Sequence, residues 1–343
     1  MLKVGIAGYG IVGKRRGECI KKNNKMQLVA VCDKTFNSRY YQKNKIKFYK
    51  NYQDLIKEEL DILFICLTND IASKVTIKAL QKNINVFCEK PPAKTLEEIE
   101  KVIAIKNKKS KIKLKYGFNH RYHHSVKEAL RIIKSKELGN LINLRCLYGK
   151  SKLITFDQPD WRTKRKIAGG GVLLDQGIHM VDLMRLFAGE FNEIKSFVLN
   201  NHWNYDVEDN AYAIMKTKDN IVGMLNSSAT QWRHKFNMEL NLDKGSLILS
   251  GILSSSKSYG EETLTIIKSN FKNKVQDSKE NTKKYNDDPS WEAEVDDFAN
   301  IVIDDLHDYD GNLKDAYRTM KLVYLIYYED VNWRKKFKIK NPK

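Results

Sequence analysis

Cysteine is scarce in this chain of 343 residues, and the five cysteines that it has show no pattern. They are odd in number, and no two of them have the C-x-x-C spacing. Neither a disulfide framework nor a zinc site is therefore indicated, and no metal is expected. Cys32, Cys66 and Cys88 fall near the ends of predicted strands, where we expect them to pack as small buried apolar groups.

Long apolar runs are also missing. No stretch approaches the roughly 18 residues that would indicate a transmembrane helix, and Met1-Leu2-Lys3-Val4 leads directly into the first predicted strand, with no signal-peptide region. These absences predict a cytoplasmic protein that has no membrane partner. At 343 residues, 42% of them hydrophobic, the chain can bury a large core, and two domains are the default expectation.

Arginine is scarce beside lysine, which matters for reading the net charge of +19. Of the 61 basic residues 49 are lysines, scattered among many asparagines and isoleucines, as codon bias in an AT-rich genome would produce. No helix-turn-helix, zinc-finger or RNP pattern accompanies the charge, so no nucleic-acid partner is expected. A basic surface would still attract anionic cofactors and substrates, including nucleotide sugars, with an effect that salt screens.

A glycine motif stands between a predicted strand and a predicted helix. The apolar run Leu2–Ala7 leads into Gly8-Tyr9-Gly10-Ile11-Val12-Gly13 and then into a helix over 11–22. A second apolar strand, 28–32, ends at Asp33, 20 residues after the last glycine. Such glycines permit a tight turn, close approach of backbone N–H groups to a pyrophosphate, and close packing of the helix on the sheet. The context predicts a dinucleotide-binding unit; a structural βαβ unit in which Asp33 is a turn residue is the alternative.

Asp33 also bears on the choice of cofactor. Its carboxylate would accept hydrogen bonds from the adenosine ribose hydroxyls and would repel a 2′-phosphate, which favours NAD and makes NADP the less favoured cofactor. Lys34 and Arg39 leave the alternative open, since either side chain could swing toward a phosphate.

A lysine follows another predicted strand. Glu89-Lys90-Pro91-Pro92 comes directly after the apolar segment 85–88. Ligands of an open α/β sheet lie outside the carboxyl ends of its strands, so Lys90 is expected to point at a cleft where it can meet a substrate. Pro91 stiffens the turn that aims the ammonium group.

The rhythm of the predicted elements changes along the chain. Strands and helices alternate to about residue 118, and continuous apolar strands such as 61–67 are typical of a parallel sheet covered on both faces. From 194 to 267 several strands follow one another with few crossover helices, which indicates an antiparallel or mixed sheet. The fold class is therefore α/β, with a doubly wound domain over 1–120 and an α+β domain over 121–343. Within the second domain we expect a hairpin tip at 254–258, a long surface loop at 269–288 and terminal helices at 291–305 and 313–330.

The second chemical constellation lies in a helix that Gly169-Gly170-Gly171 opens. Asp175 and His179 are four residues apart and share one face of that helix, so the carboxylate is placed to orient the imidazole or to raise its basicity. Asp182, three residues beyond His179, competes for that role. A histidine in an amphipathic helix is more often a packed or capping group. The glycine run favours a functional role, because backbone without Cβ can approach a ligand closely.

Together these residues resemble the glucose-fructose oxidoreductase, inositol dehydrogenase and MocA family. The resemblance covers most of the chain and is carried, in the family's order, by the glycine motif, Asp33, Glu89-Lys90-Pro91, Asn119-His120-Arg121-Tyr122 and Gly170-Gly171-x-x-x-Asp175-x-x-x-His179. It implies an N-terminal Rossmann domain and a C-terminal open, mostly antiparallel sheet used for substrate binding and for assembly into a homodimer or homotetramer. It also implies hydride exchange between a nicotinamide and a sugar or cyclitol carbinol. Thr68-Asn69-Asp70 departs slightly from the family's Thr-Pro-Asn or Thr-Pro-Asp, which leaves the shape of that cofactor loop open.

The resemblance places the catalytic residues at Lys90, Asp175 and His179. His179 is the expected base, because imidazole has the side-chain pKa nearest to neutral pH, and Lys90 would stabilise developing alkoxide charge or carry the proton itself. Asp175 would hold the imidazole tautomer, and Lys90 and His179 would face one cleft. The expected cofactor-binding residues are Gly8, Tyr9, Gly10, Ile11, Val12, Gly13, Asp33, Lys34, Thr68, Asn69 and Glu89. The expected substrate contacts are Asn119, Arg121, Tyr122, Trp161 and Arg162, each of which could equally stabilise the fold. Arg121 or Arg162 could bind a carboxylate or phosphate bidentately.

Three functions compete at this point. The favoured one is an NAD-dependent sugar dehydrogenase or ketosugar reductase, with a nucleotide-linked sugar of surface-polysaccharide synthesis as the suggested substrate. The second is an inositol or free-sugar dehydrogenase in catabolism. The third is a non-catalytic NAD-binding regulator, which loss of the lysine and the histidine would indicate; both residues are present.

Overall fold

The computed structural model describes residues 1–153, 160–254, 257–269 and 278–342. The chain divides into two compact units. The first unit comprises Met1–Asn119 and Ser290–Met320, and the second comprises His120–Pro289 and Lys321–Lys343.

The first unit is built on a seven-stranded sheet with the order β3-β4-β2-β1-β5-β6-β7. Every neighbouring pair is parallel except β3 and β4, which form an antiparallel hairpin at one edge. The order of the parallel strands therefore proceeds from β1 toward one edge of the sheet and from β5 toward the other. The carboxyl ends of β1 and β5 flank the topological switch point, at which open α/β sheets bind ligands. The strands are β1 (Leu2–Ala7), β2 (Met26–Cys32), β3 (Tyr40–Lys43), β4 (Ile46–Tyr49), β5 (Ile62–Ile65), β6 (Asn85–Glu89) and β7 (Leu114–Gly117).

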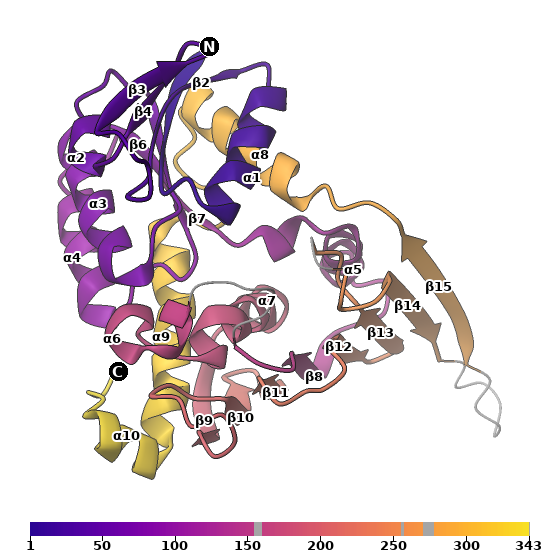
Figure 1. Ribbon diagram of the computed structural model, residues 1–343. Coiled ribbons are helices and arrows are strands. Elements are labelled where there is room, and N and C mark those ends of the chain that lie inside the picture. Colours follow the sequence, from indigo (N-terminus) through magenta and orange to yellow (C-terminus); the bar gives the residue numbers. More distant parts are fainter. Residues whose placement is uncertain (154–159, 255–256, 270–277, 343) are drawn as a thin grey trace. The chain divides into compact units, whose positions relative to one another are not determined.

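Helices cover both faces of this sheet, as its continuous apolar strands predict (Figure 1). α1 and α8 lie on one face, where the rings of Phe64 and Phe87 stack on each other and meet Phe298 of α8 edge-on. α3 and α4 lie on the other face. The Thr95 hydroxyl accepts a hydrogen bond from the Glu98 N–H at 3.3 Å, which is the helix cap that the sequence predicts. The helices are α1 (Ile11–Lys22), α2 (Tyr52–Leu55), α3 (Asn69–Gln81), α4 (Leu96–Lys106) and α8 (Ser290–Ile303).

Residues 290–320 belong to the first unit, which differs from the predicted domain division. That prediction assigns everything after residue 120 to the second domain. The reason for the difference is that apolar side chains of α8, Phe298 among them, pack in the core of the first unit, where α8 also makes a charged contact. The fully buried Arg16 binds Glu89 at 2.7 Å and Glu294 of α8 at 2.6 Å, and its guanidinium lies 4.2 Å from the ring centre of Trp291. Contacts between residues so far apart in the chain leave no local sequence signal.

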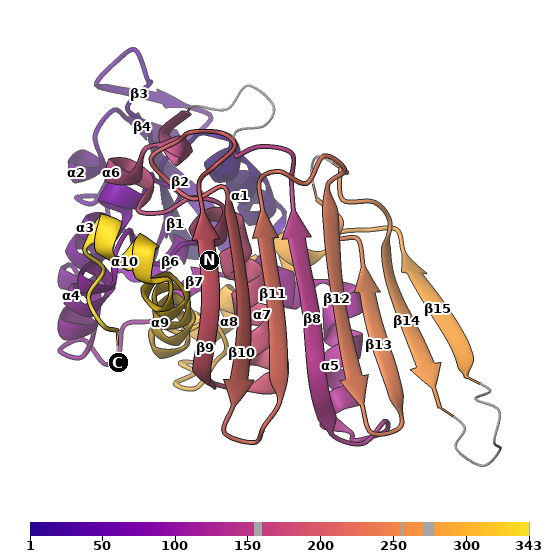
Figure 2. The same ribbon diagram turned by 90° about the horizontal axis from the view of Figure 1, so that it is seen from below.

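The second unit is built on an eight-stranded sheet with the order β15-β14-β13-β12-β8-β11-β10-β9. All neighbours are antiparallel except β8 and β11, so the sheet is mixed and mostly antiparallel, as predicted. Helices α5 and α7 lie on one face, the inner face (Figure 2). The strands are β8 (Leu141–Gly149), β9 (Phe191–Leu199), β10 (Asn210–Thr217), β11 (Val222–Ser228), β12 (Lys235–Leu242), β13 (Gly245–Ser250), β14 (Glu262–Lys268) and β15 (Lys279–Tyr285). The helices are α5 (His124–Lys134), α6 (Arg165–Ala168), α7 (Ile178–Ala188), the last part of α9 (Leu313–Glu329) and α10 (Val331–Phe337).

The predicted loop at 269–288 is wrong for its second half, because Lys279–Tyr285 forms the edge strand β15. This strand pairs with β14, and nearly all of its side chains are exposed. A strand that is polar on both faces has no apolar alternation, so periodicity could not reveal it. Residues 270–277 of that predicted loop and residues 255–256 in the middle of the predicted hairpin tip lie outside the described residues.

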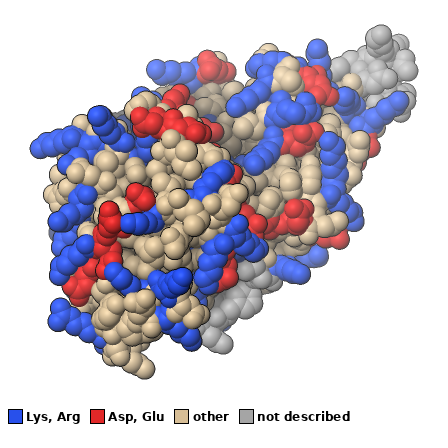
Figure 3. Space-filling model, turned by 90° about the horizontal axis from the view of Figure 1, so that it is seen from above, with Lys and Arg blue, Asp and Glu red and all other residues tan. Residues whose placement is uncertain are grey.

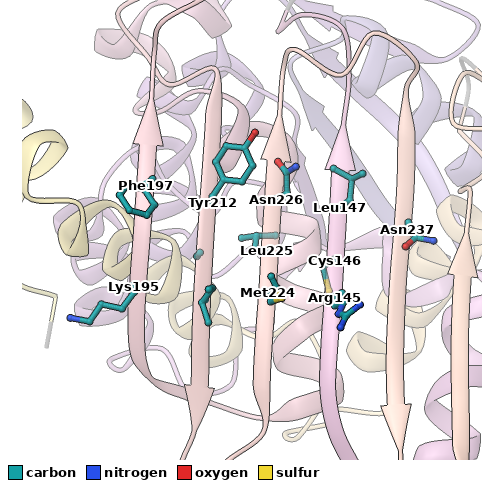
Figure 4. A pocket seen from close by; sticks show the side chains of 12 residues that line it. Arg145, Cys146, Leu147, Lys195, Phe197, Tyr212, Met224, Leu225, Asn226 and Asn237 are labelled. Atoms are coloured by element: carbon teal, nitrogen blue, oxygen red, sulfur yellow. The ribbon is translucent and has the colours of Figure 1, made fainter.

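The opposite, outer face of the second sheet presents apolar side chains to solvent. Phe197, Tyr212, Ile214 and Met224 are between 42% and 71% exposed and lie side by side on β9, β10 and β11. They line a concavity of about 730 Å³ on this face, shown in Figure 4.

No described helix is long and apolar enough to cross a membrane. Basic side chains are interspersed with acidic ones over the face drawn in Figure 3. Many of the exposed lysines are paired at the surface, as Lys22 is with Glu292 at 2.5 Å.

Candidate functional site

The glycine motif forms the turn between β1 and α1. Gly8 has φ +92°, and a Cβ on Gly13 would lie 1.9 Å from the Gly8 carbonyl oxygen, so both positions require glycine. Gly10 is the N-cap of α1, no described side chain caps the helix there, and its first turn carries no acidic residue. A Cβ on Gly10 would meet nothing within 4 Å. The N-terminus of α1 therefore presents backbone N–H groups to open space, which fits the pyrophosphate of a dinucleotide.

Asp33 contacts the glycine motif directly. Its Oδ2 accepts a hydrogen bond from the Tyr9 N–H at 2.8 Å, and its Oδ1 accepts from the N–H and the hydroxyl of Thr35 at 2.9 and 2.7 Å. The half-buried carboxylate is thus held beside the turn, where it fits the ribose hydroxyls of a dinucleotide. Lys34 is exposed, and Arg39, which is 81% exposed, lies 3.6 Å from Asp54. Of the remaining loop residues Ile11 is exposed and Val12 half-buried.

The other predicted residues of the first unit follow β5, β6 and β7. Thr68 and Asn69 begin α3, where the Thr68 hydroxyl donates to Asp70 at 2.7 Å. Lys90 is half-buried directly after β6 and forms a cis peptide bond with Pro91. Glu89 is bound to Arg16, and the Asn119 amide donates to the Ser290 hydroxyl at 3.0 Å. Glu89 thus contacts Arg16, which also binds Glu294 of α8, and Asn119 contacts the first residue of α8, Ser290.

In the second unit the glycine run packs against a buried carboxylate that the sequence analysis missed. Glu208 accepts hydrogen bonds from the N–H groups of Gly171 at 2.7 Å and Leu173 at 3.1 Å, and the Tyr327 hydroxyl donates to it at 2.5 Å. A Cβ on Gly171 would lie 2.0 Å from the Glu208 carbonyl oxygen. Burial raises the pKa of Glu208, and these hydrogen bonds oppose the rise. The glycines therefore allow close packing of backbone on backbone.

Asp175 lies in a π-helical turn, Leu173–Gly177, that precedes α7. Its Oδ2 lies 3.2 Å from Lys150 Nζ, and its Oδ1 lies 3.3 Å from Arg162 Nε. Lys150 comes directly after β8, and its side chain is 10% exposed. The wider π turn changes the regular helical spacing that the sequence predicts between Asp175 and His179. Lys150 is not among the predicted site residues, because nothing local distinguishes it from the other lysines.

His179 lies in α7, and its imidazole stacks on that of His120, with ring centres 3.9 Å apart and planes 10° apart. Nε2 of His120 lies 3.0 Å from the hydroxyl of Tyr148 on β8. Burial raises the pKa of Tyr148 well above its ordinary value, with Tyr259 and Asp175 adding to the rise, so the phenol stays protonated and can donate to the imidazole. His120 belongs to the Asn119–Tyr122 motif, but the motif alone predicts no role for it.

The remaining predicted substrate contacts differ in what they touch. Arg121 binds both oxygens of Asp182 at 2.6 Å, and the two side chains are 8% and 1% exposed, so this arginine is engaged in a buried bidentate ion pair. Tyr122 has the ammonium of Lys127 over its ring at 5.3 Å. The guanidinium of Arg162 lies 4.5 Å from the ring centre of Trp161, and both side chains are half-buried.

Further polar side chains surround this cluster. The Tyr259 hydroxyl donates to the Gln176 side chain at 3.1 Å, and the Tyr259 ring lies 5.2 Å from that of Tyr148. His234 lies 3.1 Å from the Ser151 hydroxyl. Burial lowers the pKa of His234, and the charge of Lys150 lowers it further. The second unit thus assembles imidazoles, phenols and a carboxylate with two cations on its inner face.

Two sequence models of one family match the chain. Residues 2–118 match the model described as "Oxidoreductase family, NAD-binding Rossmann fold", and residues 126–248 match the "GFO/IDH/MocA C-terminal domain". The chain is 28% identical over 195 residues to inositol 2-dehydrogenase of Salmonella typhimurium (strain LT2) and 29% identical over 202 residues to D-glucoside 3-dehydrogenase of Escherichia coli (strain K12). These alignments span 55% and 57% of this chain, and 55% and 56% of the two relatives. The chain thus spans about half the length of the curated relatives that it matches.

Solved structures share the fold over nearly the whole chain. Levoglucosan dehydrogenase in complex with NADH aligns with a TM-score of 0.83 and 16% identity over 97% of both chains. The WlbA dehydrogenase from Bordetella pertussis, in complex with NADH and UDP-GlcNAcA, aligns with a TM-score of 0.78 and 16% identity over 96% of both chains. Because models of both domains of this family match the chain, the chain belongs to the GFO/IDH/MocA family of oxidoreductases and carries that family's NAD-binding Rossmann domain.

Proposed function

We propose that this protein is an NAD-dependent sugar dehydrogenase or ketosugar reductase that acts on a secondary carbinol. The observation that carries the proposal is the set of side chains near His179: the buried, stacked imidazole of His120, the buried phenol of Tyr148, and the half-buried Asp175 carboxylate, which two cations hold. Such a set can move a proton and bind hydroxyl groups. The proposal also rests on the family to which the chain belongs.

The first unit supplies residues that fit the cofactor. The uncapped N-terminus of α1 at Gly10 would hold the pyrophosphate, and Asp33 would hold the adenosine ribose. When bound, NAD would accept a hydride from the carbinol carbon, and NADH would donate one to the corresponding carbonyl carbon. Because a carboxylate at Asp33 repels a 2′-phosphate, NAD is the proposed cofactor in preference to NADP.

The proton is assigned to His179. In oxidation its imidazole would take the proton of the substrate hydroxyl, and in reduction it would return it. We further propose that Lys90 acts on the same oxygen and stabilises negative charge as it develops there. Asp175, which binds Lys150 and Arg162, is proposed to position these cations as well as to support His179.

The substrate is proposed to be a sugar, with a nucleotide-linked sugar of surface-polysaccharide synthesis as the first candidate. The WlbA structure contains UDP-GlcNAcA, and that protein shares the fold of this chain. The inositol and glucoside dehydrogenases among the relatives favour a free cyclitol or sugar as the second candidate.

We also propose that a second copy of this chain covers the outer face of the second sheet. An isologous interface requires one self-complementary surface, and this face offers exposed apolar side chains on β9 to β11 beside the paired charges Glu193 and Lys216, 2.8 Å apart. Ile214→Lys should therefore lower the molar mass measured by light scattering, whereas Ile142→Lys, on β8, should not. An unchanged mass in Ile214→Lys would remove this part of the proposal.

The function is tested by a screen of the purified protein. Nicotinamide absorbance should report turnover with NAD or NADH and at least one member of a panel of nucleotide sugars, free sugars and inositols. Mass spectrometry of ligands retained on the protein narrows that panel. Tight dinucleotide binding without turnover of any member would favour a non-catalytic regulator in place of the enzyme.

A further inference from the structure

We propose that Trp232 and the aromatic side chains on which it rests form a stacking platform for the nucleobase of a nucleotide-linked substrate. The platform comprises His202, Trp203, Tyr205 and Trp232, all of which belong to the second unit. The proposal rests on the proposed sugar oxidoreductase and narrows its substrate class.

The first argument is the exposure of Trp232, which lies in the loop between β11 and β12. This tryptophan is 64% exposed. Among the described residues its ring meets two others: that of His202, with centres 5.3 Å apart and planes 67° apart, and that of Trp203, at 6.2 Å and 76°. Neither neighbour lies parallel to the indole. The ring is therefore available to a flat partner that stacks on it.

The second argument is that the rings on which this tryptophan rests are fixed in place. Nε1 of Trp203 donates to the carbonyl oxygen of Ala229 at 2.6 Å. The N–H groups of His202 and Trp203 donate to the buried carboxylate of Asp209 at 2.9 and 3.1 Å. Trp203 and Tyr205 also pack against a small apolar cluster of the second unit. A platform held in this way loses little conformational freedom when a ligand binds to it.

The third argument is the place of the platform in the second unit. β8 and β11 are parallel neighbours, so the chain leaves both strands at the same end of the sheet. The loops that follow them touch: the Gln231 N–H donates to the Lys150 carbonyl oxygen at 2.9 Å, and His234 Nε2 lies 3.1 Å from the Ser151 hydroxyl. Nζ of Lys150 in turn lies 3.2 Å from Asp175. The platform therefore flanks the proposed substrate site.

The fourth argument identifies the occupant as a nucleobase. Every base has a π-face that can stack on an aromatic side chain. The phosphates that join the base to the sugar would meet positive charge, because Arg233 follows Trp232, is exposed and forms no ion pair with any described residue. The polar neighbours Gln231 and Arg233 also leave the exposed apolar surface of this loop as a single ring, which is small for a protein interface.

Two nucleotides and an analogue without a base test the platform: UMP, GMP and ribose 5-phosphate. Their affinities are measured by calorimetry on the full chain saturated with NADH, which fills the dinucleotide site. We expect at least one nucleotide to bind about tenfold or more tightly than ribose 5-phosphate, a difference of about 1.4 kcal/mol. The tighter nucleotide shows whether a pyrimidine or a purine fits. Equal affinities for all three probes would overturn the proposal.

Variants then locate the effect. Trp232→Leu keeps an apolar side chain and removes the π-face, so the ratio of nucleotide affinity to ribose 5-phosphate affinity should fall at least about fivefold. Trp232→Phe keeps a smaller ring and should retain part of the ratio. Because the position is exposed, both variants should fold as the wild type does. The matched control is Tyr40→Leu, which replaces a 48% exposed aromatic residue on β3 of the first unit and should leave the ratio in place.

Two outcomes count against the proposal at this stage. One is a ratio that Trp232→Leu and the control lower equally. The other is a molar mass by light scattering that falls in Trp232→Leu while the ratio persists, which would mean that a second copy of the chain covers the ring.

Failure of the platform is distinct from failure of the proposed function, because these measurements require binding and no turnover. Turnover of sugars by a protein that shows no preference for nucleotides overturns only the platform. A preference that Trp232→Leu removes, without turnover of any sugar, supports the platform and overturns the enzyme.

Discussion

The imidazole rings of His120 and His179 lie face to face, with centres 3.9 Å apart and planes 10° apart. The far side of this pair is anchored on β8, because His120 Nε2 lies 3.0 Å from the Tyr148 hydroxyl. A flat neighbour at this distance restricts the rotation of the His179 ring. His120 is therefore expected to be a positioning residue for the proposed base.

His120→Ala should lower turnover by about two- to tenfold, since an aromatic pair contributes about 0.5–1.5 kcal/mol beyond its buried area. His120→Phe keeps a flat ring in the stack and should retain more activity than His120→Ala. Tyr148→Phe serves as the matched control for loss of the hydrogen bond alone. Single-turnover nicotinamide absorbance with the identified substrate measures all three, and an undiminished rate in His120→Ala would remove the positioning role.

Lys90→Ala and His179→Ala should each reduce turnover by a factor on the order of 10² or more, because they remove charge stabilisation and proton transfer. NAD affinity should change little, since the glycine motif and Asp33 are the proposed dinucleotide contacts. Losses in the double variant should be less than multiplicative if the two residues act as a unit. Asp175→Asn should cost less turnover than His179→Ala. Full rates in both single variants would mean that another route carries the proton.

NAD(H) should bind at least about tenfold more tightly than NADP(H), a difference of about 1.4 kcal/mol. The reason is the Asp33 carboxylate, which is held beside the glycine motif by the Tyr9 N–H at 2.8 Å. Calorimetry should show that Asp33→Ser narrows or inverts the gap, while Lys34→Met leaves it in place. Equal affinities for the two dinucleotides in the wild type would contradict the assignment.

Arg121→Met should destabilise the fold by about 3–5 kcal/mol, because it removes the guanidinium that binds both oxygens of the buried Asp182 carboxylate. Replacing both residues, by Arg121→Met with Asp182→Leu, should recover much of that loss, since an apolar pair puts no charge in this buried position. Lys127→Met, at an exposed position nearby, is the control. Urea unfolding measures the differences, and a near-neutral Arg121→Met would show that the pair contributes little.

The stability of the first unit should fall as pH rises through weakly acidic values. Burial raises the pKa of Glu294 from 4.5 to about 7, although Arg16, which it shares with Glu89, opposes the rise. Between these two values the native state binds more protons than the unfolded state, so the free energy of unfolding decreases with increasing pH. The contribution is complete below about pH 4.5 and lost above about pH 7.

Glu294→Gln cannot ionise and should flatten this dependence. Melting temperatures recorded from about pH 5 to about pH 8 provide the comparison, with Glu292→Gln, whose side chain is 55% exposed, as the control. A wild-type profile that rises over this range would show that Arg16 keeps Glu294 ionised.

Local patterns in the sequence determined most of the architecture. Glycines at fixed spacing, continuous apolar strands and the Thr95 cap depend on backbone sterics and on neighbours within a few residues, so they could be read along the chain. The predicted helix 11–22 and the predicted change from a parallel to a mixed sheet both agree with the structure. The edge strand β15 escaped because its side chains are polar on both faces.

Tertiary structure alone decided which polar groups meet. Arg16 with Glu294, Asp175 with Lys150, and Glu208 with Tyr327 join residues between 25 and 278 positions apart in the chain. The strength of an ion pair depends on distance and burial, and a sequence contains neither. The sequence alone therefore could not tell that Arg121 forms a buried bidentate pair with Asp182, whereas Arg162 binds Asp175 through Nε.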